Sequence, residues 1–141
     1  EDTNLLVKVE VLVKAPLEQV WSCWTTPADV MRWNNASPDW HTPTATNDFN
    51  VGGEYHYLMA AKDGSASFDF WGTYTEIVPQ QRILSALGDG RTVDVTFEQI
   101  GDAVKVTEVF EIEHENSREL QQQGWQAILD SFKHHVETDH A

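Results

Sequence analysis

A single glutamate interrupts the apolar face of the last strand-like segment of the chain. Glu108 stands between Val106 and Phe110, at the period-two position that should point with them into the interior. Withdrawal of a carboxylate from water raises its pKa, so that it can donate a proton or a hydrogen bond near neutral pH. We therefore predict that Glu108 is a polar anchor for a ligand or a catalytic acid–base group. The structural alternatives are a bulge at this position and an ion pair with Arg82 or Arg91.

A second group of chemically capable side chains lies between residues 33 and 48. These residues combine stacking rings, an amide and titratable groups, and they predict a lid that orients a ligand at a cavity entrance. His41 is the second catalytic candidate. The structural alternative is that Trp40 plugs the helices onto the sheet while His41 is solvated. The members of this group are Trp33, Asn34, Asp39, Trp40, His41 and Asp48.

Period two also places several aromatic side chains on the inner face. Tyr55 and Tyr57 alternate with His56, which should face outward, and an inward hydroxyl needs a partner or a ligand. Phe70 should point inward and Asp69 outward; if the faces of that strand are reversed, Asp69 becomes a pocket carboxylate. The residues predicted to contact a ligand are Trp33, Asn34, Trp40, His41, Tyr55, Tyr57, Phe70, Tyr74, Phe97, Glu108 and Trp125.

The sequence patterns of other kinds of site are absent. His134, His135 and His140 form the dense histidine group, but adjacent residues diverge on a helix, and no HExxH or paired-cysteine motif occurs. The chain has no GxSxG motif and no phosphate-binding loop. Cys23 is expected to pack within a short helix rather than act as a nucleophile. We therefore expect no metal and no cofactor.

Periodicity places the elements that must position these side chains. Residues 5–14 alternate and predict a strand with one buried face. Pro16 and the pair Thr26-Pro27 suit the starts of two short helices. Residues 34–50, with two prolines and many polar side chains, should be irregular. From Gly52 onward, alternating segments joined by short turns predict an antiparallel meander, with six strands following the short helices.

The final segment changes to a helical period. Asn116 has capping-box spacing to Glu119, and Ser117 is an alternative cap. The apolar stripe that follows contains Leu120, Trp125, Ile128, Leu129, Phe132 and Val136.

The prediction is an α+β fold in which residues 1–141 form one domain. A seven-stranded curved antiparallel sheet should carry two short helices and a long C-terminal helix across it. One slim helix cannot fill the concave side of a broad sheet lined with aromatic rings. We therefore expect an internal apolar cavity.

Composition excludes some partners. The chain has 9 basic and 23 acidic residues, a net charge of −14, which repels nucleic-acid phosphates and anionic membranes. It has no apolar run of about 18 residues, the length that a membrane helix requires. The single cysteine excludes an internal disulfide, which is typical of a reducing compartment and favours a cytoplasmic location.

Four ordered motifs resemble a known superfamily. The run from Ala15 to Trp21, at the start of the first helix, is similar to the opening of the START-related helix-grip (SRPBCC) superfamily, which includes polyketide cyclases. The runs Val51–Tyr55, Gly72–Pro79 and Gly124–Leu129 resemble its branch of homologues of a heat-shock chaperone's ATPase activator. The resemblance implies the helix-grip fold and an internal hydrophobic cavity. Where this branch places aromatic residues after Trp33, the chain instead has a polar asparagine pair.

Three functions are compatible with these features. The leading hypothesis is a protein that binds a hydrophobic or aromatic small molecule in its cavity. The second is a cyclase- or hydrolase-type enzyme that uses Glu108 or His41 on a bound hydrophobic substrate; the sequence does not decide whether the protein is an enzyme. The third is a chaperone-interacting module, by resemblance alone. The chaperone activator carries a separate N-terminal domain that these residues do not include, which weakens the third hypothesis.

Overall fold

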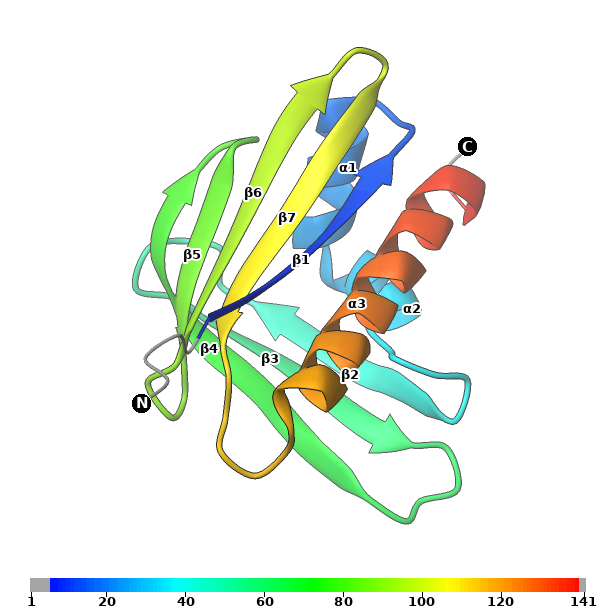
Figure 1. The fold of residues 1–141 in the computed structure, drawn as a ribbon, viewed down its shortest axis with the longest axis vertical. Coiled ribbons are helices and arrows are strands. Elements are labelled where there is room, and N and C mark those ends of the chain that lie inside the picture. Colours follow the sequence, from blue (N-terminus) through cyan, green and yellow to red (C-terminus); the bar gives the residue numbers. More distant parts are fainter. Residues whose placement is uncertain (1–5, 140–141) are drawn as a thin grey trace.

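A strongly curled antiparallel sheet forms the body of the protein in the computed structural model, which describes residues 6–139 (Figure 1). The sheet has seven strands in the order β1-β7-β6-β5-β4-β3-β2, so that each strand after β2 pairs with the one before it and β1 adds beside β7. The strands are β1 (Leu6–Val13), β2 (Trp40–Asn47), β3 (Glu54–Ala61), β4 (Ser67–Val78), β5 (Arg82–Leu87), β6 (Thr92–Ile100) and β7 (Ala103–Glu111).

The helices lie on the concave side of this sheet. Two short helices, α1 (Leu17–Thr25) and α2 (Pro27–Trp33), connect β1 to β2. The long helix α3 (Arg118–His134) crosses the opening between the two ends of the sheet and continues into a π-helical turn, η1 (His135–Asp139) (Figure 1). This architecture confirms the predicted α+β helix-grip fold. None of the helices in the described part of the chain combines the length and apolarity that a bilayer crossing requires.

Helix α3 begins with a side-chain cap. The hydroxyl of Ser117 accepts a hydrogen bond from the Leu120 amide at 3.1 Å, which satisfies one of the free amides of the first turn. Ser117 is therefore the N-cap, rather than Asn116.

Side chains of α3 also hold the exposed edge of the sheet. Lys133 Nζ donates to the Leu12 carbonyl at 2.7 Å, and Gln126 donates to the Glu10 carbonyl at 3.1 Å. Arg118 donates to the Leu6 carbonyl. Because β1 is an edge strand, these carbonyls face no neighbouring strand. The bonds protect that edge and set the position of α3 across the sheet.

The prediction of an irregular segment over residues 34–50 was wrong for residues 40–47 and holds for the residues on either side. Strand β2 lies there, and it is the first of the six strands that follow the short helices. It pairs with β3, and its register shifts between His41 and Thr44, at Pro43. Proline, which lacks an amide, fits a sheet at an edge strand or a bulge, and β2 provides both. Its polar residues masked the strand because one side of an edge strand remains in water.

The predicted inner faces of the other strands are confirmed. Tyr55, Tyr57 and Met59 of β3 are buried, and Glu108 shares the buried face of β7 with Val106. The pairing of Glu108 with Val9 on one side and Val95 on the other is continuous, so β7 has no bulge at this point. The carboxyl group is therefore delivered to the concave side by regular strand geometry.

A glycine allows close packing where β3, β4 and β5 meet. A Cβ atom on Gly72 would lie 2.7 Å from the Tyr55 hydroxyl oxygen and 2.9 Å from the Ala86 carbonyl oxygen. Both distances are shorter than real Cβ contacts, so any side chain at this position must displace the ring or the backbone. Gly124 on α3 is different, because a Cβ there would meet no atom within 4 Å.

We expect the substitution Gly72→Ala to lower the free energy of unfolding by roughly 1–3 kcal/mol, because it overpacks a dense site. Gly124→Ala is the matched control and should raise it by roughly 0.5–1 kcal/mol, because alanine favours the helix. Urea denaturation of both variants measures the two changes. Equal destabilisation by both substitutions would contradict the packing described here.

Candidate functional site

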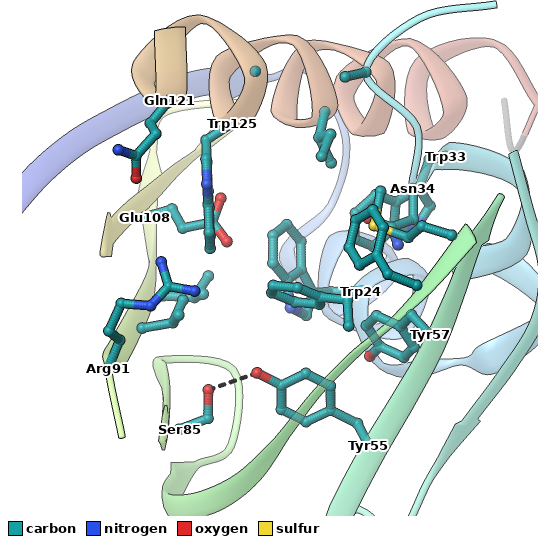
Figure 2. Close-up of a pocket in the computed structure, with 18 of the residues that line it drawn as sticks. Trp24, Trp33, Asn34, Tyr55, Tyr57, Ser85, Arg91, Glu108, Gln121 and Trp125 are labelled. Carbon is teal, nitrogen blue, oxygen red and sulfur yellow. Dashed lines mark hydrogen bonds between the residues drawn. The ribbon is translucent and has the colours of Figure 1, made fainter. Parts of the chain in front are cut away.

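A cavity of about 410 Å³ lies between the concave face of the sheet and helix α3 (Figure 2). Aromatic and aliphatic side chains form most of its wall, and a few polar groups interrupt them. The residues that line it are Trp24, Trp33, Asn34, Ala36, Trp40, Tyr55, Tyr57, Met59, Phe68, Phe70, Tyr74, Ile83, Ser85, Arg91, Val93, Val95, Glu108, Glu113, Asn116, Gln121, Gly124, Trp125 and Ile128. The volume and the lining are compatible with the binding of a small molecule.

The two sides of the cavity differ in chemistry. Figure 2 shows Glu108, Arg91 and Gln121 together on one side, close to the ring of Trp125. The opposite side is formed by the rings of Trp24 and Trp33, with Tyr57 and Asn34 beside them. A ligand that fills the cavity thus meets a polar group of side chains at one side and an aromatic wall at the other.

Glu108 is buried without a counter-charge. It is 7% exposed, and burial raises the pKa of its carboxyl group from 4.5 to about 8. Over residues 6–139 no hydrogen bond or ion pair involves its carboxyl group, and its oxygens border the cavity rather than tightly packed protein. Arg82 bonds Asp94 on the outer face at 2.8 Å, and Arg91 bonds Asp89 at 2.8 Å. The ion-pair alternatives for Glu108 are therefore excluded, and its acid form is favoured at neutral pH.

The wall around Glu108 explains its desolvation. The indole of Trp125 stacks on the ring of Phe110 with centroids 4.0 Å apart and planes 8° apart. Phe70 meets Trp125 edge-on at 5.9 Å. These rings come from α3, β7 and β4, so three elements remove water from one side of the carboxyl group.

A hydroxyl pair forms another polar point in the wall. The Tyr55 and Ser85 oxygens are 2.9 Å apart, and either hydroxyl can donate (Figure 2). Burial raises the pKa of Tyr55, so its hydroxyl stays protonated. Two hydroxyls joined by one hydrogen bond retain one proton for a further acceptor.

Gln121 has a structural role at the cavity rim. Its Nε2 donates to the carbonyls of Glu113 and Asn116 at 3.1 and 2.9 Å, and its Oε1 accepts from the Glu113 amide at 2.9 Å. These three bonds fix the segment between β7 and α3. Gln121 consequently holds the rim of the cavity and has little capacity left for a ligand.

The structure brings together nine of the eleven predicted ligand contacts. Phe97 is an exception, since it packs in the core against Trp21 at 5.1 Å and Trp24 at 5.9 Å. His41 is the other: it is half-buried on β2 and does not line the cavity. The nine residues in the lining are Trp33, Asn34, Trp40, Tyr55, Tyr57, Phe70, Tyr74, Glu108 and Trp125. Glu108 is thus the catalytic candidate that reaches the cavity.

The segment predicted to be a lid is anchored to the sheet. Asn34 is 7% exposed, its Nδ2 donates to the Thr42 hydroxyl at 3.3 Å, and that hydroxyl donates to the Asn34 carbonyl at 2.6 Å. Trp40 contacts Phe68 with ring centroids 6.0 Å apart. These contacts make the start of β2 a fixed part of the entrance.

Sequence reasoning missed five polar residues of the lining: Ser85 and Arg91 in the wall, and Glu113, Asn116 and Gln121 at the rim. Ser85 shares the buried face of β5 with Ile83 and Leu87, at the period-two position. The same signal identified Glu108 on β7. Arg91 follows a glycine turn, and no period indicated that its side chain would reach the cavity. Only the curvature of the sheet brings this turn against β7 and α3.

On the predicted outward face of β3 and β4, His56 contacts two acidic side chains and a tryptophan ring. His56 contacts Asp69 at 2.8 Å and Glu54 at 2.9 Å, and it stacks on Trp71 with planes 6° apart. The hydrogen bond to Asp69, followed by that to Glu54, raises the pKa of His56. Asp69 therefore does not point into the cavity, and the face prediction is confirmed.

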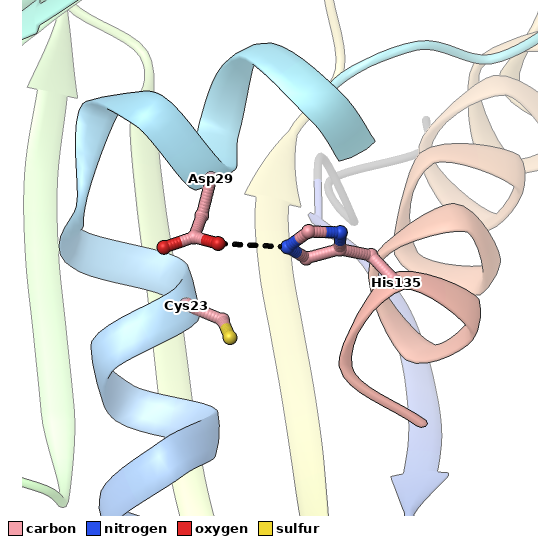
Figure 3. A group of neighbouring side chains, drawn as sticks. All are labelled: Cys23, Asp29 and His135. Atoms are coloured by element: carbon pink, nitrogen blue, oxygen red, sulfur yellow. Dashed lines mark hydrogen bonds and ion pairs between the residues drawn. The ribbon is translucent and has the colours of Figure 1, made fainter. Parts of the chain in front are cut away.

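A third group lies away from the cavity, where α1, α2 and the end of α3 meet (Figure 3). His135 Nε2 and Asp29 Oδ1 form a hydrogen bond of 2.9 Å, which ties α2 to the last helical turn. The Cys23 thiol is nearby, and burial raises its pKa to about 11. Within residues 6–139 these are the three ligand-type side chains that converge, with their atoms within 4.8 Å of one another, and their types suit zinc. His140 lies outside the described residues.

Comparisons with known proteins identify a sequence family and solved structures with the same fold. The sequence model of the family described as "Activator of Hsp90 ATPase homolog 1-like protein" matches residues 14–137. The solved AHSA1-like protein of Aeromonas hydrophila is 42% identical, with a TM-score of 0.87 over 95% of this chain and 94% of its own. Chr148 of Cytophaga hutchinsonii is 49% identical, with a TM-score of 0.82 over 94% and 92%.

A more distant structure shares the fold alone. CalU16 of Micromonospora echinospora is 17% identical, with a TM-score of 0.70 over 96% of this chain and 78% of its own. The comparison with curated proteins finds no match.

The raised pKa of Glu108 predicts how stability depends on pH. Below pH 4.5 the carboxyl is protonated in both states, and between pH 4.5 and about 8 unfolding releases its proton, so this group lowers stability as the pH rises. Glu108→Gln should therefore match the wild type near pH 4. Near pH 8 it should be more stable by on the order of 3 kcal/mol.

Urea unfolding of the two proteins across this pH range measures the difference. Exposed Glu98 on β6 offers the matched control, and Glu98→Gln should give no comparable gain because that carboxylate keeps its water. A pH-independent difference between wild type and Glu108→Gln would show that Glu108 ionises normally.

Proposed function

Since the chain belongs to the family of Activator of Hsp90 ATPase homolog 1-like proteins, we propose that it binds a hydrophobic or aromatic small molecule in the cavity beneath α3. Membership of the family accounts for the fold but does not define a function, and the cavity is the candidate binding site. Its volume of about 410 Å³ suits a ligand of two or three fused or linked rings.

One observation carries this proposal: a carboxyl group without a partner faces an apolar cavity. A buried polar group normally has a hydrogen-bond partner, since an unsatisfied one costs about 1–3 kcal/mol. No described residue bonds to the Glu108 carboxyl, whose oxygens reach the cavity space, and core packing alone would favour an aliphatic side chain in its place. A ligand oxygen in the cavity supplies the missing partner.

A second candidate function rests on the same residue. A carboxyl with a pKa of about 8 is a competent general acid at neutral pH, so the site can also support cyclisation or hydrolysis of a bound hydrophobic substrate. For such an enzyme, Glu108→Gln should abolish turnover while leaving substrate affinity within about threefold, which turnover and equilibrium binding assays measure. Equal loss of binding and turnover would assign Glu108 to ligand positioning.

The other partner assignments also remain proposals. A chaperone contact, suggested by the family description, is tested by co-purification with Hsp90 and by stimulation of its ATPase activity. The charge of −14 argues against nucleic acid and anionic membranes as partners. The single, buried, free cysteine supports a reducing, cytoplasmic location.

Filling the cavity from α3 tests the ligand-binding function. Gly124 lines the cavity and has open space at its Cβ position, so Gly124→Leu should occupy ligand volume without disturbing the fold. Aromatic and lipid-like compounds that raise the melting temperature of the wild type should lose most of that shift in the variant.

Gln122→Leu provides the control, because Gln122 is exposed on the same helix two residues away. It should keep the ligand-induced shift. Ligand shifts of equal size in wild type and Gly124→Leu would place binding outside the cavity.

A further inference from the structure

The hydrogen-bonding capacity left in the cavity wall is mainly that of donors. Gln121 is committed to the rim, and Asn34 is tied to Thr42. The hydroxyls of Tyr57 and Tyr74 interact with each other and with Asn47. The polar groups with donor capacity left include the acid form of Glu108, the hydroxyl pair of Tyr55 and Ser85, and the guanidinium of Arg91. A ligand that satisfies them must therefore be rich in hydrogen-bond acceptors.

Among residues 6–139, Arg91 is the only basic residue that lines the cavity. Its Nε donates to Asp89 Oδ2 at 2.8 Å, and its Nη1 lies 3.4 Å from the Glu111 carbonyl. Its Nη2 has no hydrogen-bond partner within residues 6–139. The turn before β6 thus fixes the guanidinium plane by its Nε edge and leaves an Nη donor available at the cavity.

Asp89 holds the Nε edge of Arg91, and the other acidic side chains nearby form their hydrogen bonds with other groups. The Glu111 carboxylate accepts from the amide and the hydroxyl of Thr92 at 2.9 and 3.0 Å. Glu113 accepts from the Asn116 amide at 2.7 Å and from its side chain at 3.1 Å. The Asn116 amide and, more weakly, the charge of Arg91 lower the pKa of Glu113, but no hydrogen bond joins Glu113 to Arg91. Glu108, the other acidic residue of the lining, favours its neutral form. Within residues 6–139, Asp89 is therefore the carboxylate bound to Arg91, and the Nη2 donor remains open.

We propose that the ligand is an aromatic or polycyclic carboxylic acid, which enters with its ring system against Trp24 and Trp33 and its carboxylate at the side of Arg91 and Glu108. This inference rests on the ligand-binding function proposed above and assigns its chemical class. The guanidinium supplies the counter-charge, and the Glu108 carboxyl donates to the bound carboxylate.

The charge of Arg91 favours a carboxylic acid over an amine as the ligand. The aromatic wall and the overall charge of −14 would suit an amine, which could pair with an ionised Glu108. However, Arg91 lies on the same side of the cavity as Glu108 (Figure 2) and would repel an ammonium group placed there. The surface charges act through water and salt, which screen them over about 10 Å, so the nearest group dominates.

A matched series of biphenyl probes tests the assignment by isothermal titration calorimetry. The probes are biphenyl-4-carboxylate, biphenyl-4-carboxamide and 4-phenylbenzylamine, which share one ring system and differ in charge. At pH 7 the carboxylate should bind the wild type at least about tenfold more tightly than the amide, and the amine should bind most weakly. Arg91→Gln should lower the carboxylate affinity about tenfold or more and change the amide affinity less than about twofold.

Two further variants show whether a change in affinity comes from the charge of Arg91 or from a general disturbance of the fold. Arg91→Lys retains the charge and should retain the preference for the carboxylate. Arg82→Gln removes an arginine that pairs with Asp94 and Glu76 on the outer face, and it should leave all three affinities unchanged. In the wild type the carboxylate affinity should fall as the pH rises through about 8, where Glu108 ionises, and in Glu108→Gln it should not.

The outcomes separate the two proposals. Binding of the amide or the amine more tightly than the carboxylate, or an unchanged preference in Arg91→Gln, overturns the assignment of the carboxylic acid and leaves the binding function standing. If none of the three probes binds the wild type and the cavity stays closed to other aromatic compounds, the binding function fails as well.

Discussion

The concave face of the sheet is wider than the helix that covers it, and the rest of the structure depends on this mismatch. Helix α3 contributes one apolar stripe, whereas seven curled strands present inward side chains around it. Rings from α1, α2 and the sheet fill part of the space, as in the contacts of Trp24 and Trp33 with Phe132 at 4.9 Å. The remainder is the cavity, which neither a broader helix stripe nor a flatter sheet would leave.

The position of α3 maintains that opening. Its side chains bond the carbonyls along β1, and Gln121 fixes the segment that leads into it from β7. At the far end, His135 joins Asp29 of α2. The helix is therefore held at both ends and along one edge, so it cannot settle deeper into the sheet and close the cavity. Stability that direct packing would provide is supplied instead by contacts at the rim.

The polar groups in the cavity wall work against folding and for binding. An ionised Glu108 would be costly beside the stacked rings of Trp125 and Phe110, and the protein avoids that cost by retaining a proton. Ser85 and Tyr55 satisfy each other only in part. Such groups make the empty site less stable than an aliphatic core would be, and a suitable ligand recovers part of the difference. This is the usual trade between stability and function at a binding site.

The sequence by itself determined the order and the faces of most elements. Period two identified the buried sides of β1, β3, β4, β6 and β7, and it placed Glu108 inside, because side chains of a strand must alternate whatever its neighbours are. The helical stripe of α3 followed in the same way. These are local properties of the backbone, so a single sequence carries them.

Only the tertiary structure decided which inward residues share one space. Phe97 and Tyr74 have the same signal in the sequence, yet the first packs against α1 while the second faces the cavity. Strand β2 escaped prediction because an edge strand with a bulge tolerates proline and polar residues. Arg91 reaches the site, and Cys23 approaches His135, because curvature and helix crossing bring distant segments together. Such long-range geometry depends on how all the elements pack, and no local period encodes it.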